Sequence, residues 1–171
     1  MQPRIHRHQK ADGRELLLYG DKPYGTALKE DTTATGAASH MRWHPLRGEW
    51  VIYAAARQAR TFLPQVNACP LCAANGERVG EIPFDDFEIA VFENRFPAFS
   101  SIDETPASVA GADAAAALGR CEVVVYSADH AASLSTLPDA RLRLLIDVWA
   151  DRVKSLRDMG FVSVLPFENR G

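Results

Sequence analysis

Long apolar runs, an even set of cysteines and a surplus of positive charge are all missing from this 171-residue sequence. The only apolar run in the basic N-terminal stretch, residues 16–19, is far too short for a signal-peptide core or a membrane span, so we expect a cytoplasmic protein. Three cysteines do not suggest the disulfide framework of a secreted domain. A formal net charge of -3 disfavours nucleic-acid binding but leaves room for a local pocket that binds a small anion.

Nucleotide-binding fingerprints and internal repeats are absent as well. The sequence contains no Walker loop and no Gly-x-Gly-x-x-Gly pattern, the two common phosphate-binding signatures. What is present is a hydrophobic content of 47%, which is enough for one substantial core. The length favours one globular domain or a part of a larger protein.

Polar and turn-forming runs dominate the first 40 residues, as in "GDKPYG" and "KEDTTATGAASH". They predict an N-terminal arm or loosely packed extension over residues 1–40, with the main domain at residues 41–171. The Ala-rich residues 100–119 are expected to form a surface loop. Runs rich in β-branched and aromatic residues, bounded by turn formers, predict strands at residues 48–56, 87–96 and 120–130.

A helix is the clearest element of the second half of the chain, and it is predicted over residues 138–159. Pro138 suits its first turn and Gly160 its C-terminal stop. A last strand is expected at residues 161–171, which gives an α+β fold: a mainly antiparallel sheet with one long helix packed on it. Apolar residues at three-and-four spacing predict its buried face: Leu142, Leu145, Ile146, Trp149, Val153 and Leu156.

Cys69 and Cys72 lie three residues apart in "CPLCAANGERVG". Two thiolates at this spacing fit a tetrahedral zinc ion, because a short turn can point both sulfurs at one centre. A redox pair would stand at a strand-to-helix junction, whereas Pro70 and the loop after Cys72 favour a knuckle. Incidental core cysteines are a third interpretation, and two cysteines are only half a zinc site.

The best candidate for a further ligand is His130, in "YSADH" just after a predicted strand. Loops at strand ends bring sequence-distant residues together, although a solvated loop histidine beside Asp129 is the simpler alternative. Cys121 lies in strand-like sequence and is best explained as a small buried apolar residue.

Four polar side chains are candidates for binding a nucleotide. Arg57 and Arg60 follow the first predicted strand, and their planar guanidinium groups could clamp a diphosphate unless they are ordinary surface arginines. Asn94 and Asn169 each end a strand-like run in a similar phrase, "FENRF" and "FENRG". Their amides could bond ribose, base or phosphate, or serve as turn residues.

Taken in order, these motifs resemble the N-terminal half of the galactose-1-phosphate uridylyltransferases, a family of the histidine-triad superfamily. The resemblance covers nearly the whole chain, including the leader-like "ADGRELLLYGDKP". It implies a histidine-triad-like fold of which this chain is an incomplete half. The motifs that carry it are "RWHPLRGEWVIYAAARQARTFLP", "CPLC", "FENRFPAF", "VVVYSADH", the long helix and "FENRG".

The resemblance also implies roles for individual residues. Cys69, Cys72 and His130 match three ligands of a structural zinc ion. Arg57 and Arg60 match a pair that reaches the nucleotide phosphates, often across a dimer interface. Family members typically work as homodimers, and we expect the same here.

The family's uridine diphosphate pocket is matched at three further positions. Asn94 and Asn169 correspond to amides that line the pocket, and Phe92 is placed to flank the uracil. A local departure is Ala56, because the family often has a histidine immediately before the first arginine.

In the family, the chain continues beyond "FENRG" to a His-Pro-His-Gly-Gln motif that supplies the fourth zinc ligand and the nucleophilic histidine. This sequence stops at Gly171, and none of its five histidines lies in such a motif. We therefore expect a chain truncated before the catalytic motif, with no catalytic residue of its own. A missing segment or a separate C-terminal half would supply the rest.

The implied activity is UMP transfer from UDP-glucose to galactose 1-phosphate through a uridylyl-histidine, a step of galactose metabolism. The arginines and amides would hold the phosphates and offset developing charge. One alternative is a related nucleotidylyltransferase or phosphorylase acting on ADP-glucose or a dinucleoside polyphosphate, because arginine clamps do not distinguish bases. Another is a zinc-stabilised nucleotide-binding module without chemistry.

Overall fold

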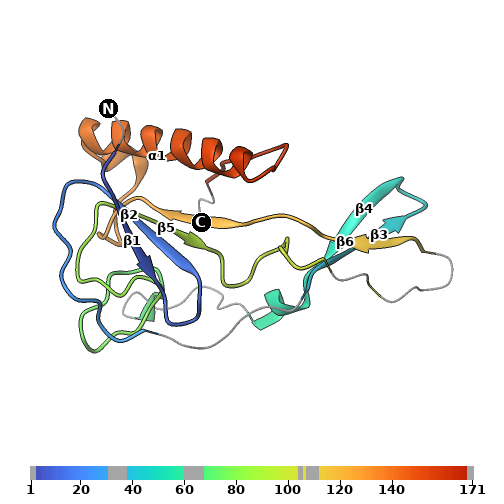
Figure 1. Ribbon diagram of the computed structural model, residues 1–171, viewed down its shortest axis with the longest axis horizontal. Coiled ribbons are helices and arrows are strands. Elements are labelled where there is room, and N and C mark those ends of the chain that lie inside the picture. Colours follow the sequence, from blue (N-terminus) through green and yellow to red (C-terminus); the bar gives the residue numbers. More distant parts are fainter. Residues whose placement is uncertain (1–2, 31–37, 60–67, 104–105, 107–111, 169–171) are drawn as a thin grey trace.

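Two antiparallel sheets and one long helix make up the computed structural model, which describes residues 3–30, 38–59, 68–103, 106 and 112–168. One sheet has the strand order β1-β2-β5-β7 and the other β4-β3-β6. Figure 1 shows α1 along one face of the four-stranded sheet, with the three-stranded sheet towards the other end of the molecule. The elements are β1 Ile5–Gln9, β2 Glu15–Tyr19, β3 His40–His44, β4 Glu49–Tyr53, the 3-10 helix η1 Ala55–Ala59, β5 Ile89–Glu93, β6 Ala114–Ala116, β7 Glu122–Val125, the 3-10 helix η3 Leu134–Thr136 and α1 Asp139–Asp158.

The predicted α+β class, a mainly antiparallel sheet with one long helix, is confirmed. Strands β4, β5 and β7 fall within their predicted ranges, and every strand pair is antiparallel. Pro138 caps the N-terminus of α1, and Gly160 follows its end with φ of 96°. A positive φ suits glycine because it has no Cβ, so the predicted stop signal acts at the backbone.

The first strands correct the expectation of a loosely packed arm over residues 1–40. Strand β2 lies between β1 and β5, and its residues from Leu16 to Tyr19 are almost completely buried. Leu16 and Leu18 pack on one side with Ile82, whereas Leu17 and Tyr19 face the other side. The apolar run is a single central strand that is covered on both faces. It therefore lacks the alternation of polar and apolar residues that marks a strand with one face in solvent.

The helix α1 covers the second of these faces. Leu145 and Val148 pack against Leu17 and Tyr19 of β2 and against Ile89 of β5. Burial of both sides of β2 therefore joins the helix layer, the sheet and the loops on the opposite side into one core.

The buried stripe of α1 differs from the predicted one. Leu145, Val148, Arg152 and Leu156 are buried, whereas Ile146 is 60% exposed and Trp149 36% exposed. On the buried side of α1, Arg152 Nε and Nη2 donate to the two Glu122 carboxylate oxygens on β7, each at 2.9 Å. A bidentate ion pair thus belongs to the buried face of α1, and the spacing of apolar residues gives no sign of it.

Two further expectations about local structure were wrong. Residues 161–168 form no strand in the described part of the chain, and Val162 is 97% exposed. An apolar stretch becomes a strand only where a partner strand supplies hydrogen bonds. Conversely, Ala114–Ala116, within the predicted loop, is strand β6 and pairs with His40–Arg42 of β3.

No helix within the described residue ranges is long and apolar enough to cross a membrane.

Candidate functional site

The two cysteines lie in a tight turn, which we call the knuckle (residues 69–72). The amide of Cys72 donates to the carbonyl of Cys69 at 3.4 Å, so both side chains leave the same turn. Gly80 passes directly over this turn, because a Cβ placed there would lie 2.7 Å from the Pro70 carbonyl oxygen. Next to it, the amide of Glu81 donates to the same oxygen at 2.8 Å. Only a residue without a side chain permits this approach, so Gly80 sets the position of the knuckle.

His130 reaches the knuckle from the far end of β7. Its loop is shaped by the Asp129 carboxylate, which accepts the Ala131 amide at 2.9 Å. His130 Nδ1 lies 3.2 Å from Cys72 Sγ, and the potential ligand atoms of Cys69, Cys72 and His130 all lie within 4.8 Å of one another. Fifty-eight positions separate Cys72 from His130, so the fold itself creates this cluster.

The three side chains fit a zinc ion. Ligand atoms at zinc distances of about 2.0–2.3 Å stand roughly 3.5–3.8 Å apart in a tetrahedral site, close to the spacing observed here. Cys69 and Cys72 are buried, whereas His130 is exposed. Burial and the neighbouring Cys69 thiol raise the pKa of Cys72, so an ion must displace its proton to bind the thiolate. A hollow of about 240 Å³ adjoins the cluster and is lined in part by Leu71 and Tyr126.

Arg57 and Asn94 both hold the turn that follows β5, which we call the 93–96 turn. Arg57 Nη1 donates to the Phe96 carbonyl at 3.1 Å, and the Asn94 side-chain oxygen accepts the Phe96 amide at 2.9 Å. The backbone amide of Asn94 donates to the backbone carbonyl of Cys121 at 2.8 Å. The structure thus brings Arg57 and Asn94 together at one turn, although Arg57 lies in η1 after the three-stranded sheet and Asn94 follows β5 of the four-stranded sheet.

Phe92 lies beside this turn but inside the core. Its side chain is 3% exposed and packs with Leu16 and Leu18. The Lys10 ammonium lies over the ring, 5.1 Å from its centroid. The predicted contact of Phe92 with uracil therefore stays a prediction, as do the nucleotide contacts of Arg57 and Asn94. Two predicted site residues, Arg60 and Asn169, lie outside the described residues.

Sequence reasoning missed the charged cluster between the knuckle and the 93–96 turn. Glu81 is 6% exposed and pairs with Lys10, with Arg14 at 2.6 Å and with Arg95 at 2.7 Å. In the sequence, two charged residues of this cluster stand directly after residues of the recognised motifs: Glu81 follows Gly80, and Arg95 follows Asn94. Their spacing in the sequence gives no reason to pair them, and they become neighbours only when the chain folds.

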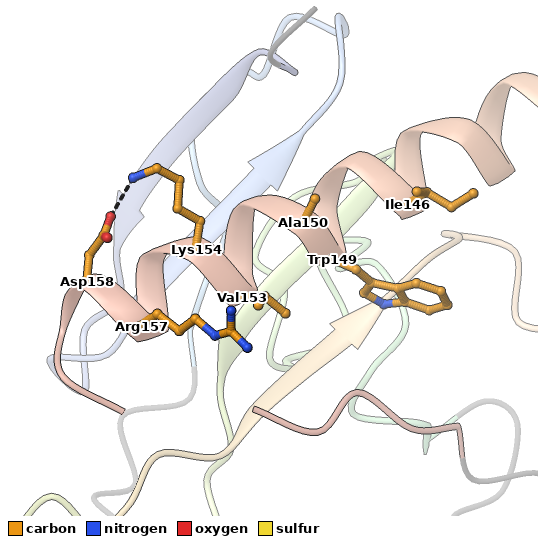
Figure 2. Close-up of a pocket in the computed structure, with 7 residues that line it drawn as sticks. All are labelled: Ile146, Trp149, Ala150, Val153, Lys154, Arg157 and Asp158. Carbon is orange, nitrogen blue, oxygen red and sulfur yellow. Dashed lines mark hydrogen bonds and ion pairs between the residues drawn. The ribbon is translucent and has the colours of Figure 1, made fainter. Parts of the chain in front are cut away.

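A second hollow, of about 600 Å³, lies on the outer side of α1 and contains no predicted site residue. Figure 2 shows Trp149, Val153 and Arg157 along one side of the helix and the exposed ion pair of Lys154 with Asp158. Its lining comes from α1 alone: Ile146, Trp149, Ala150, Val153, Lys154, Arg157 and Asp158.

Comparison with known proteins identifies the family. Residues 28–171 match the family model described as galactose-1-phosphate uridyl transferase, N-terminal domain. The galactose-1-phosphate uridylyltransferase of Streptomyces lividans is 36% identical over 165 residues, which is 94% of this chain and 42% of that protein. The enzyme of the same name from Thermotoga maritima is 35% identical over 137 residues, 77% of this chain and 41% of that protein.

A solved uridylyltransferase structure aligns with 70% of this chain and 36% of its own, at 21% identity and a TM-score of 0.49. The chain thus spans about two fifths of the length of the relatives it matches. The match over residues 28–171 includes the knuckle, His130 and the 93–96 turn. This chain belongs to the galactose-1-phosphate uridylyltransferase family and contains its N-terminal domain.

Proposed function

We propose that this chain is the zinc- and nucleotide-binding part of a UDP-glucose–hexose-1-phosphate uridylyltransferase. The observation that carries the proposal is the meeting of Cys69, Cys72 and His130 at one point in a chain of this family. The proposed substrates are UDP-glucose and galactose 1-phosphate, and the proposed assembly is a homodimer. In the proposed reaction a histidine attacks the α-phosphorus of UDP-glucose and glucose 1-phosphate leaves. The uridylyl group then passes from the histidine to galactose 1-phosphate, which frees the histidine.

The proposed metal is a structural zinc ion held by Cys69, Cys72 and His130. Bound zinc would supply cohesion rather than acid–base chemistry, because thiolate and imidazole ligands tie separate segments to one centre. The knuckle precedes β5 in the chain and His130 follows β7, and these two strands are neighbours in the sheet. Fixing one loop to the other keeps the surface around the 93–96 turn in a single arrangement.

The proposed nucleotide contacts are Arg57, Arg60, Phe92, Asn94 and Asn169. Support comes from Arg57, whose guanidinium uses Nη1 on the Phe96 carbonyl and carries five N–H donors in total. A guanidinium fixed at one end can present its other donors to phosphate oxygens with little loss of side-chain entropy. Its role in transfer would be to orient the phosphates and offset the charge that develops on them.

The experiment that tests this function is the thermal unfolding of zinc-loaded protein with and without UDP. At a UDP concentration of about 100 Kd, binding stabilises the folded state by about 2.7 kcal/mol, or roughly 5–10 °C for a chain of this size. Arg57→Ala should abolish this shift. Arg143→Ala, an exposed arginine on α1, is the matched control and should keep it.

ADP in place of UDP separates the proposal from its main alternative. A larger shift with UDP than with ADP supports a uridylyltransferase, and an equal or larger shift with ADP favours an adenylyl-specific relative. No shift with either nucleotide, in protein that unfolds when zinc is removed, would overturn the nucleotide site and leave a zinc-stabilised module.

A further inference from the structure

A buried cluster of charged side chains lies between the knuckle and the 93–96 turn. We call it the Glu81 cluster, and none of its side chains is more than 13% exposed. Its three cations surround Glu81, and the only other acid is Asp12, which pairs with Arg14 at 2.6 Å. Its members are Lys10, Asp12, Arg14, Glu81 and Arg95.

The backbone of Glu81 is bound to the knuckle. Its amide donates to the Pro70 carbonyl at 2.8 Å, and its carbonyl accepts Lys10 Nζ at 2.9 Å. The next residue, Ile82, is fully buried and bridges to Ala73 just after the knuckle. Movement of the knuckle therefore carries Glu81 with it.

The side chain of Glu81 is bound to the 93–96 turn. Its Oε1 forms an ion pair with Arg95 Nε at 2.7 Å, within the turn itself. Its Oε2 accepts Arg14 Nη2 at 2.6 Å, and Arg14 Nη1 donates to the Glu93 carbonyl at 2.6 Å. Two routes thus run from one carboxylate to the backbone that positions Asn94.

The charge balance makes the carboxylate necessary. Removing one partner of a buried ion pair is strongly destabilising, because the remaining charge has neither solvent nor an opposite charge beside it. Lys10, Arg14 and Arg95 all depend on Glu81, which no other acid of the cluster can replace at all three positions. The carboxylate is therefore held at one place by groups from two parts of the chain, the turn between β1 and β2 and the 93–96 turn.

We propose that Glu81 is a positioning residue that couples metal binding at the knuckle to nucleotide binding at the 93–96 turn. The inference rests on the proposed function, since it needs a nucleotide at that turn. Coupling between two sites is reciprocal, so zinc strengthens UDP binding and UDP strengthens zinc binding by the same factor.

The test compares wild type with Glu81→Gln, which keeps the shape of the side chain but removes its charge. Arg95→Gln cuts one of the two routes to the turn and leaves the route through Arg14 in place. Glu77→Gln changes an exposed glutamate of the same loop as a control. Zinc affinity is measured by competition with a chromophoric chelator, and UDP affinity by calorimetry on zinc-loaded protein. The absorption of cobalt-loaded protein during a UDP titration reports directly on the metal ligands.

In Glu81→Gln we expect zinc affinity to fall about tenfold, as for other residues that orient metal ligands. UDP affinity should fall by at least about fivefold, the lower end of typical coupling between sites. Arg95→Gln should weaken UDP binding and leave zinc affinity unchanged. UDP should shift the cobalt spectrum of wild type and Glu77→Gln, shift it less in Arg95→Gln, and leave it unchanged in Glu81→Gln.

Glu81→Gln protein that binds zinc and UDP as wild type does would overturn the inference, and so would an unchanged cobalt spectrum in UDP-bound wild type. If Glu81→Gln does not fold, the double variant Lys10→Met with Glu81→Gln removes one charge of each sign and takes its place in every measurement. Zinc-loaded wild type that binds no UDP would overturn the proposed function, and this inference with it.

Discussion

Replacement of Arg152 by methionine tests how α1 is held on the sheet. Arg152 and Glu122 form a two-bond ion pair whose side chains are 8% and 9% exposed. The carboxylate raises the pKa of Arg152, so the guanidinium stays charged at any accessible pH. Arg152→Met removes one partner and leaves Glu122 buried, which typically costs 3–5 kcal/mol.

We expect a value near the lower end, about 3 kcal/mol, because a second cation partly compensates the loss. Arg120 Nε lies 2.9 Å from Glu122 Oε1 and keeps one charged contact in the variant. Adding Glu122→Gln to Arg152→Met removes the stranded charge and should recover part of the lost stability.

The assay is urea unfolding at a fixed zinc concentration, followed by circular dichroism of the helix. Lys154→Met is the control, because it breaks an ion pair on the same helix whose side chains are 73% and 63% exposed. It should leave the free energy of unfolding unchanged. An Arg152→Met variant as stable as Lys154→Met would refute the idea that this ion pair helps to hold α1 on the sheet.

Three other changes give sharp expectations. Leu18→Ala empties part of the core and should lower the free energy of unfolding by about 2–5 kcal/mol in urea titrations; a cost near zero would restore the loosely packed arm. Gly80→Ala places a Cβ against the Pro70 carbonyl and should lower zinc affinity in chelator competition, whereas Gly25→Ala, with open space around its Cβ, should not. Burial and the hydrogen bond to Asp151 raise the pKa of Tyr19. Unfolding therefore releases its proton above about pH 10, so wild-type stability falls as the pH rises beyond that value, and Tyr19→Phe should flatten that fall from about pH 10 upwards.

The cysteine pair of the metal cluster was predictable because its chemistry is local. Two thiols in one short turn fit a metal knuckle, with a redox pair and incidental core cysteines as alternatives. A histidine at a strand end can reach such a turn from a neighbouring strand, and the family resemblance pointed to His130. Strands β5 and β7 were also found from composition, and they are the pair that brings His130 to Cys72. Sequence and structure agree here because each ligand lies next to an element that its own residues specify.

The misassigned elements depend on partners that lie far away in the chain. The run from Leu16 to Tyr19 gives no alternation because both of its faces are covered, one by α1 and the other by residues around Ile82. Strand β6 consists of alanines and exists because β3 supplies its hydrogen bonds. The Glu81 cluster joins residues from Lys10 to Arg95, and no spacing rule connects positions so far apart.

The central claim, a metal centre built by the fold and used by this family, is tested most directly by metal analysis of purified protein. We expect about one zinc ion per chain, measured by plasma mass spectrometry after exhaustive dialysis. His130→Ala should retain clearly less zinc, because the third ligand comes from a loop 58 positions away from Cys72. Wild-type protein without zinc, or His130→Ala protein with as much zinc as wild type, would show that the three side chains do not form a zinc site.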